Sequence, residues 1–354
     1  MPAGVKYVTD MFHAGKDGMP WHGISTPFEE DSPYLRDADA AGEYCGMFEQ
    51  VNKEEILLAK NAIQIIKDLR DGFTTYEKAI EQIGDMSETE FFSIFNTVRN
   101  KTHAVMGSRY EPYQTKQMAE WIQPILDTGE MILATGGMLD EGSKAWFLAK
   151  MNRDNSEIVK GDEVAKFILI SNSHDGTRSI AAGFTPVRVV CANTLAMAMH
   201  SAASKLLKVR HTKSAVETME KVREVMNLAN QEFEATADQY RFLASKQVNA
   251  AGLKKFVKII CNVEDKKDED ISTRTINTMS RIVELFEGGL GTSIAGVRGT
   301  YWGAYNAVTE WLNYERGRTA ENRLNSLWFG PNMKANTDAL KVAVDVANGK
   351  YNLA

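Results

Sequence analysis

The residues whose spacing most resembles a catalytic motif are the glycines of GTSIAGVR, at positions 291–298. They reproduce the GxxxxG spacing of a phosphate-binding P-loop, in which a Lys and then a Ser or Thr must follow to bind phosphate and magnesium. Val297 and Arg298 occupy those positions instead, so the sequence does not predict a nucleotide-binding P-loop. A loop that contacts phosphates through Arg298 and free backbone N–H groups stays open.

The histidines and cysteines form no catalytic or metal-binding pattern. The six histidines contain no HxH, HExxH or HxxxH spacing, and the three cysteines contain no CxxC pair. His174 and Asp175 are typical of turn chemistry, and Cys191 lies among apolar residues, where a free Cys usually behaves as a small core side chain. No pair of acids lies in an apolar setting. We therefore predict no catalytic residues, no metal ligands, no cofactors and no enzymatic activity.

Positive charge is concentrated in one part of an acidic chain. The formal net charge is −6, yet residues 160–213 hold eight Lys and Arg against three Asp and Glu, a net of +5. Local charge determines local potential, so this region predicts a surface that binds a polyanion. A solvated helix face would give the same pattern and is the alternative.

A nucleic-acid surface needs Lys and Arg for the phosphates and aromatic platforms for unstacked bases. On a helix expected over residues 194–208, Lys205 and Lys208 share one face, and the cations that follow extend it. Trp146 is predicted to be a core residue rather than a stacking platform. The predicted nucleic-acid-binding residues are Lys144, Lys166, Arg178, Arg188, Lys205, Lys208, Arg210, Lys213 and Arg298.

The elements that would position these residues follow from hydrophobic periodicity and turn signals. Helices are predicted over residues 52–69, 75–83, 87–98 and 115–126, the first capped by Asn52 with Glu55 as its capping-box partner. Two β-hairpins are predicted over residues 130–152 and 164–191, the second with Asp175-Gly176 as a two-residue turn. Further helices are predicted over residues 194–208, 212–245, 273–287 and 336–348.

These elements predict an α+β fold, in which an antiparallel β-meander with a β-β-β-α type core is enclosed by helices. The amphipathic helix over residues 212–245 would pack either inside the subunit or against another subunit. The charged segment at 261–273 suggests a boundary. The predicted parts are an irregular and helical N-terminal segment (1–105), an α+β core (106–262) and a helical C-terminal segment (263–354).

Location follows from the absence of other signals. The longest apolar runs fall short of the roughly 18 residues that a membrane span needs, and the first residues show no signal-peptide pattern. Three scattered cysteines fit a reducing compartment. We expect a cytoplasmic protein with no membrane partner.

Three separated motifs carry a resemblance to a known family: PWHG at 20–23, AAGFTPVRVVCANTLAMA at 181–198 with SHDGTRS before it, and GTYWGAYNAVTEW at 299–311. The chain resembles a family of phage- and plasmid-encoded proteins whose domain has no known function. The resemblance implies a mobile-element gene expressed in a bacterial host. The order of hairpins and helices is also similar to the core of single-strand annealing proteins of the Redβ and Erf superfamily, although no sequence motif is shared.

Together these features predict an oligomeric protein, in a ring or filament, that binds single-stranded DNA or RNA and promotes strand annealing in recombination. The rival hypothesis is a phage scaffold or host-takeover protein that acts through protein contacts alone. A third is an enzyme that uses scattered acidic ligands to hold Mg²⁺ on nucleic acid.

Overall fold

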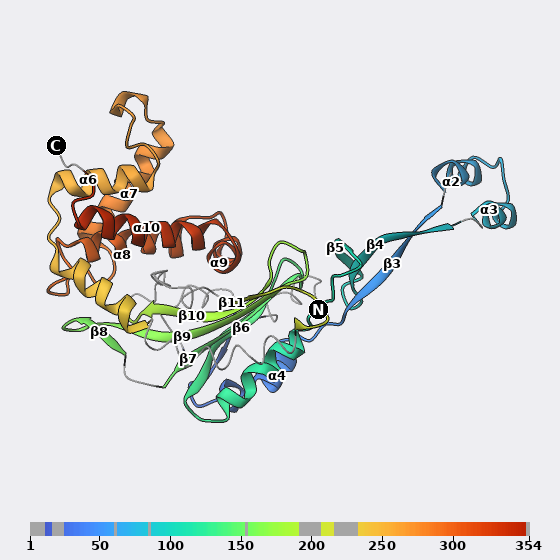
Figure 1. Ribbon diagram of the computed structural model, residues 1–354, viewed down its shortest axis with the longest axis horizontal. Helices are drawn as coiled ribbons and strands as arrows, with labels where there is room; N and C mark the ends of the chain where they lie inside the picture. The colour runs from blue at the N-terminus through green and yellow to red at the C-terminus, as the bar shows by residue number, and fades with distance from the viewer. Residues whose placement is uncertain are drawn as a thin grey trace.

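The computed structural model describes residues 11–15, 25–59, 62–83, 86–152, 155–190, 207–215 and 233–351. A large sheet lies at the centre, helices lie on both of its faces, and a long arm projects from one end (Figure 1). Helices and a mostly antiparallel sheet occur together, which confirms the predicted α+β class.

The central sheet has the strand order β11-β10-β9-β7-β6-β1-β2, and β8 pairs with β9. Among the described strands, β1 and β2 pair in parallel and the other pairs are antiparallel. Hairpins β6–β7 and β9–β10 confirm the two predicted hairpins. The strands are β1 (Met11–Ala14), β2 (Thr26–Phe28), β6 (Met131–Leu139), β7 (Lys144–Met151), β8 (Ser156–Val159), β9 (Asp162–Ser173), β10 (Ile180–Arg188) and β11 (Leu207–Val209).

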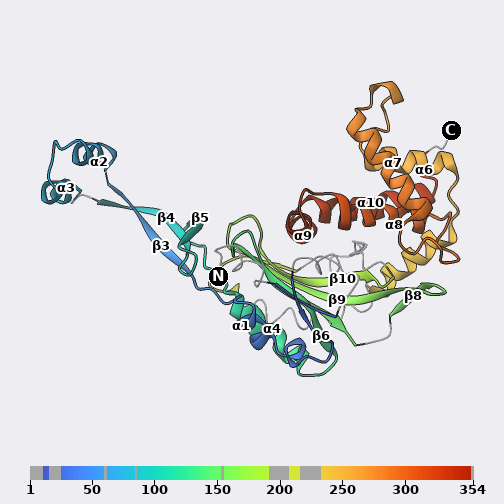
Figure 2. The ribbon, with the colours of Figure 1, turned by 180° about the vertical axis from the view of Figure 1, so that it is seen from behind.

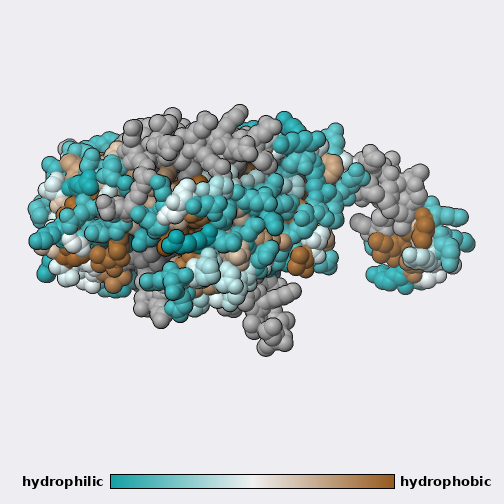
Figure 3. Space-filling model, turned by 90° about the horizontal axis from the view of Figure 1, so that it is seen from below, coloured by the Kyte–Doolittle hydropathy of each residue, from teal (hydrophilic) through white to brown (hydrophobic). Residues whose placement is uncertain are grey.

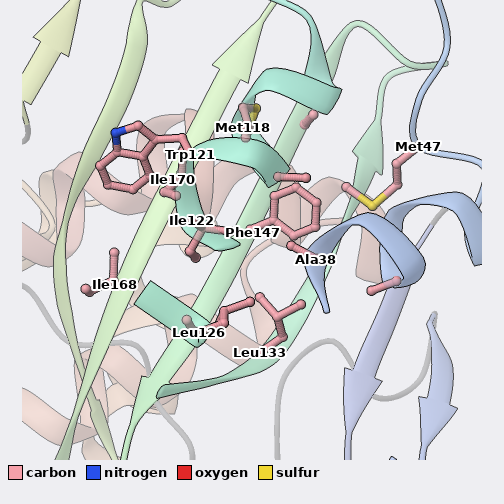
Figure 4. Packing of buried hydrophobic residues seen from close by; sticks show 14 of the residues in the cluster. Ala38, Met47, Met118, Trp121, Ile122, Leu126, Leu133, Phe147, Ile168 and Ile170 are labelled. Atoms are coloured by element: carbon pink, nitrogen blue, oxygen red, sulfur yellow. The ribbon is translucent and has the colours of Figure 1, made fainter. Parts of the chain in front are cut away.

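Both faces of this sheet are buried, which explains its long apolar runs. Successive side chains of a strand point to opposite faces. Phe147 therefore packs with α4 (Thr115–Leu126), as Figure 4 shows, and with α1 (Ala38–Tyr44), which follows the 3-10 turn η2 (Pro33–Arg36). Trp146 faces the other way, is fully buried against α9 (Ala320–Phe329), and is confirmed as a core residue.

A second apolar cluster holds the helical unit together. Its described members are a helix at residues 233–245 and the named elements that follow it. They are α6 (Ala250–Ile260), η3 (Asp268–Asp270), α7 (Thr273–Gly288), α8 (Tyr301–Glu310), the π-helical turn η4 (Trp311–Glu315), α9 and α10 (Pro331–Ala347). Elements α7 and α10 confirm two predicted helices. Among the described residues, no helix has both the length and the apolar character needed to cross a membrane.

The arm is a three-stranded sheet with two helices at its end (Figures 1 and 2). It consists of β3 (Val51–Ala59), α2 (Ala62–Arg70), α3 (Tyr76–Ile83), β4 (Met86–Asn96) and β5 (Lys101–Gly107). The side chain of Gln114, at the start of α4, holds the base of the arm in place. It accepts a hydrogen bond from the Val51 N–H at 3.1 Å and donates one to the Val51 carbonyl at 2.8 Å. The α3 and α4 predictions are confirmed.

One predicted helix in the arm is wrong, and another is correct only in its second part, which is α2. Residues 52–59 form strand β3 instead of the first part of a helix, and residues 87–96 lie in strand β4. Long-range pairing of β3 with β4 overrides the helix propensity of the Glu, Lys, Leu and Ala residues in β3.

Three further expectations need correction or lie outside the described residues. The β9–β10 connection spans residues 174–179, so Asp175-Gly176 is not a two-residue turn. Residues 207–209 form β11, so the helix predicted over 194–208 cannot include its last two positions; residues 191–206 lie outside the described part. The predicted helix over 212–245 is helical at residue 215 and at 233–245, and it lies outside the described part at 216–232. Residues 212–214 form a bend and a turn instead.

Candidate nucleic-acid interface

Three chain segments meet at the end of the central sheet next to the arm. The Glu111 N–H donates to the His211 carbonyl at 3.1 Å, which joins the segment after β5 to the segment after β11. The His174 N–H donates to the Ser143 carbonyl at 2.6 Å, which joins the β9–β10 loop to the β6–β7 turn. Ring contacts of His174 with His103 and His211 bring residues 103–111, 174–178 and 207–213 together.

The rings of three histidines and a tyrosine lie close together beneath this surface. The ring centroids of His103 and His174 lie 6.4 Å apart, and those of His174 and His211 lie 6.5 Å apart. Tyr110 stacks on His211 at 4.8 Å with an interplanar angle of 16°. We call these four residues the histidine cluster. Within the described part of the chain, Nδ1 of His174 is buried without a hydrogen-bond partner.

Burial keeps these imidazoles neutral. Desolvation lowers the pKa of His174 to about 3, and its two histidine neighbours add to the shift. Desolvation also lowers the pKa of His211 to about 4, against the opposing effect of the Glu111 and Arg178 backbone. The pKa of His103 falls for the same reason, with Lys101 adding to it. The cluster therefore contributes stacked rings but no positive charge at neutral pH.

The β9–β10 loop is ordered by its own polar side chains. Asp175 accepts from the Thr177 N–H at 2.9 Å and hydroxyl at 2.6 Å, and also from the Ser173 hydroxyl. Burial alone would raise the pKa of Asp175, but these bonds and nearby Lys144 lower it. The expected turn chemistry at His174 and Asp175 is thus what the structure shows.

The histidine cluster is rimmed by exposed cations. Arg109 precedes Tyr110, and Arg210 and Lys213 flank His211; all three side chains are exposed. Nearby Lys53 is already neutralised by Glu111 at 3.1 Å. In the described part of the chain, no acidic side chain forms an ion pair with Arg109, Arg210 or Lys213, so the local excess is three positive charges. We call these three residues the basic rim.

Four predicted residues lie on or near this end of the sheet. Lys208 pairs with Ala181 across β10 and β11, and Arg210 and Lys213 belong to the basic rim. Arg178 is half-buried and donates to the Phe329 carbonyl. Lys205 lies outside the described residues.

Lys144 and Lys166 are less available than predicted. Lys144 is 12% exposed and bonds to Asp140 at 2.5 Å, with Asp175 at 3.4 Å. Lys166 is also 12% exposed, pairs with Glu234 at 2.9 Å and lies over the Phe233 ring. Binding a phosphate would require each lysine to give up its carboxylate.

Arg188 lies at the opposite end of β10 from Ala181, about 24 Å away along the strand, and it is fully buried. Its Nε and Nη2 each bond to the Asp162 carboxylate at 2.8 Å, and its Nη1 donates to the Leu290 carbonyl at 3.1 Å. Trp302 Nε1 donates to the same carboxylate at 2.8 Å. This buried network joins the sheet to α8, and its geometry leaves Arg188 no surface that could contact a phosphate. Arg298 is exposed in the loop after α7, apart from the basic rim.

Sequence reasoning missed Arg109 and Tyr110, although SRYEPY at 108–113 interleaves a cation with aromatics. Both residues belong to a surface that forms when the segment after β5 packs against the segment after β11. Among the described residues, no group of three or more His, Cys, Asp or Glu side chains is arranged to hold a metal ion. The exposed cations of the basic rim can bind an anionic ligand.

Comparison with protein-family descriptions matches residues 102–328 to the Domain of unknown function (DUF932). The match starts in β5, ends in α9, and so contains the histidine cluster, the basic rim and the Arg188 network. Comparisons with curated proteins and with solved structures gave no match. Because the family description covers well over half of the 354 residues, the chain belongs to the DUF932 family.

Proposed function

We propose that this protein binds single-stranded nucleic acid as an oligomer and promotes strand annealing for a phage or plasmid in its bacterial host. The observation that carries the proposal is the basic rim, where three exposed cations without described acidic partners lie within two residues of the stacked rings of Tyr110 and His211. Such cations neutralise phosphates without sequence preference. Function then consists of binding, with no covalent step.

The proposed surface differs from the predicted one in its members. It consists of Arg109, Arg210 and Lys213, with the half-buried Arg178 nearby. Because the strand would be held by its phosphates, its base edges would stay free to pair with a second strand. The similarity in element order to annealing proteins supports this proposal by analogy alone.

Reversing two charges of the basic rim should abolish most of the binding. We expect Arg210→Glu/Lys213→Glu to weaken binding of a 40-base oligonucleotide at low salt at least tenfold, because attraction becomes repulsion. The slope of log K against log salt should also become shallower by roughly 0.7 for each phosphate that the variant no longer neutralises. Fluorescence anisotropy across a salt series measures both quantities.

The matched control is Lys160→Glu/Lys341→Glu, which reverses two exposed cations far from the rim. Thermal melting verifies that both variants fold, since exposed substitutions usually alter stability by less than about 0.5 kcal/mol. Equal losses in the two double variants would mean that binding is diffuse, and unchanged binding in the rim variant would refute the site. If the unaltered protein binds no oligonucleotide at low salt, the rival scaffold function is favoured.

A further inference from the structure

We infer that the protein assembles head to tail, with the helical end of the arm of one copy docked into a cleft between α6 and α7 of the next copy. The proposal concerns the oligomer of the proposed function, but it does not depend on nucleic acid. It rests on two apolar features that the fold leaves exposed at opposite ends of the molecule.

The first feature is the arm tip, which consists of α2, α3 and the turn between them. Ile65 and Ala79 are buried where the two helices pack on each other, and no other described element packs on them extensively. Five other apolar side chains of the described part of the tip are exposed, and Figure 3 shows apolar residues gathered at this end of the molecule. They are Ile66, Leu69, Phe73, Tyr76 and Ile80, with exposures of 62%, 37%, 82%, 66% and 53%.

So many exposed apolar side chains in one place are unusual for a surface that contacts only solvent. Residues 66, 69 and 73 recur at helical spacing along α2 and its end, and residues 76 and 80 do so on α3, so each helix presents one apolar face. A pair of helices this short cannot bury such faces by itself. A contiguous exposed apolar patch marks an interaction site.

The second feature is the α6–α7 cleft, which has a volume of about 640 Å³. Its apolar lining consists of Leu253, Val257, Ile271, Ile276, Met279 and Val283. Pockets of about 300–1,000 Å³ hold drug-sized ligands, so this cleft has room for several large side chains. An apolar groove between two helices accepts the apolar face of another helix.

The two features cannot meet within one copy. The arm carries α2 and α3 to one end of the long axis, and α6 and α7 lie at the other end, as Figures 1 and 2 both show. Strand β3 alone spans nine residues, roughly 30 Å. A projecting tip and a distant cleft therefore fit each other only between copies.

The apolar area of the tip supports a second copy as the occupant. An aromatic side chain buries about 150–250 Å², so the five tip residues could remove on the order of 500 Å² from water, a large share of the 800 Å² per partner of a standard interface.

An association between two different surfaces propagates, because each bound copy still offers a free tip and a free cleft. Such heterologous contacts close into a ring or extend as a filament, depending on the angle between copies. The described part of the amphipathic helix predicted over residues 212–245 does not offer a second surface for contacts between copies. Phe233, Ala237 and Tyr240 are all buried within the subunit.

The test uses one variant for each surface and light scattering of the nucleic-acid-free protein over a range of concentrations. Phe73→Glu alters the tip and Ile276→Glu alters the cleft, and both side chains are exposed, at 82% and 44%. Each variant should raise the apparent dissociation constant by at least about 30-fold, the effect expected for an interface hot spot. Phe91→Glu, on β4 and 57% exposed, is the matched control and should assemble like the unaltered protein.

Mixing the two variants gives the decisive result. Phe73→Glu retains an intact cleft and Ile276→Glu retains an intact tip, so the mixture should form one-to-one dimers and nothing larger. A tip-to-tip contact would instead leave Ile276→Glu self-associated and the mixture without such dimers, and this would overturn the proposal. A monomer at every concentration in the unaltered protein, or equal effects of Phe91→Glu, would also overturn it.

The same samples separate this proposal from nucleic-acid binding. Phe73→Glu should retain the intrinsic affinity of each subunit for a short oligonucleotide, and Arg210→Glu/Lys213→Glu should retain assembly. Apolar association should also persist at salt concentrations that release nucleic acid.

Discussion

Replacing Asp162 with Asn should lower the free energy of unfolding by about 3–5 kcal/mol, the cost of leaving a buried charge without its partner. Arg188 and Asp162 are both fully buried, and the carboxylate accepts three bonds from the guanidinium and one from Trp302. Asn has nearly the same shape but no charge, so the substitution isolates the electrostatic effect. Urea unfolding followed by tryptophan fluorescence measures it.

Two comparisons make this result specific. Glu284→Gln removes one partner of an exposed ion pair with Arg281 and should cost less than about 1 kcal/mol. Adding Arg188→Met to Asp162→Asn should recover part of the lost stability, because no unpaired charge is then left in the interior. An Asp162→Asn protein as stable as its parent would contradict the role of this network.

Acidification from pH 7 to pH 5 should destabilise the protein by about 4 kcal/mol through the histidine cluster. The folded pKa values of His174 and His211 are about 3 and 4, below the ordinary value of 6.5. Between these limits the unfolded chain binds protons that the folded chain excludes, so stability falls as the pH falls. At pH 5 each imidazole contributes about 2 kcal/mol to the loss.

His211→Phe provides the control, because it preserves a ring beside Tyr110 and removes one titrating group. The variant should lose only about half as much stability over the same pH range. The measurement is the free energy of unfolding in urea at pH 7, 6 and 5. A flat profile in the unaltered protein, or identical slopes in the two proteins, would show that these imidazoles are not neutral and buried.

Local sequence signals predicted those elements whose partners are near in the chain. Helix α4 and the hairpins β6–β7 and β9–β10 were correct because periodicity and nearby turn residues determine them. Strands β3 and β4 were missed for the opposite reason. Phe91 and Phe92 are adjacent and the arm sheet buries few side chains, so no alternation of apolar and polar residues marks β4 as a strand.

The candidate site was predictable only in its charge. Arg210 and Lys213 were found because cations cluster in the sequence, but their neighbours Arg109 and Tyr110 arrive from a segment about 100 residues earlier. Arg188 shows that a cluster of cations in the sequence can also mislead. It was predicted to bind phosphate, but it is buried and pairs with Asp162, an acid 26 positions earlier. Charge alone does not distinguish these two fates, whereas the apolar neighbours of Arg188 on β10 are typical of burial.

The Asp162 network also has a consequence for the order of folding. Asp162 and Trp302 are 140 residues apart, whereas each hairpin of the sheet forms between neighbouring strands. Contacts between distant parts of a chain form more slowly than local ones, so the hairpins should pair before α8 docks. Until then Arg188 and Asp162 are in water, and docking must strip that water from both at once. The docking of the C-terminal helices on a preformed sheet is therefore the step at which we expect the main folding barrier.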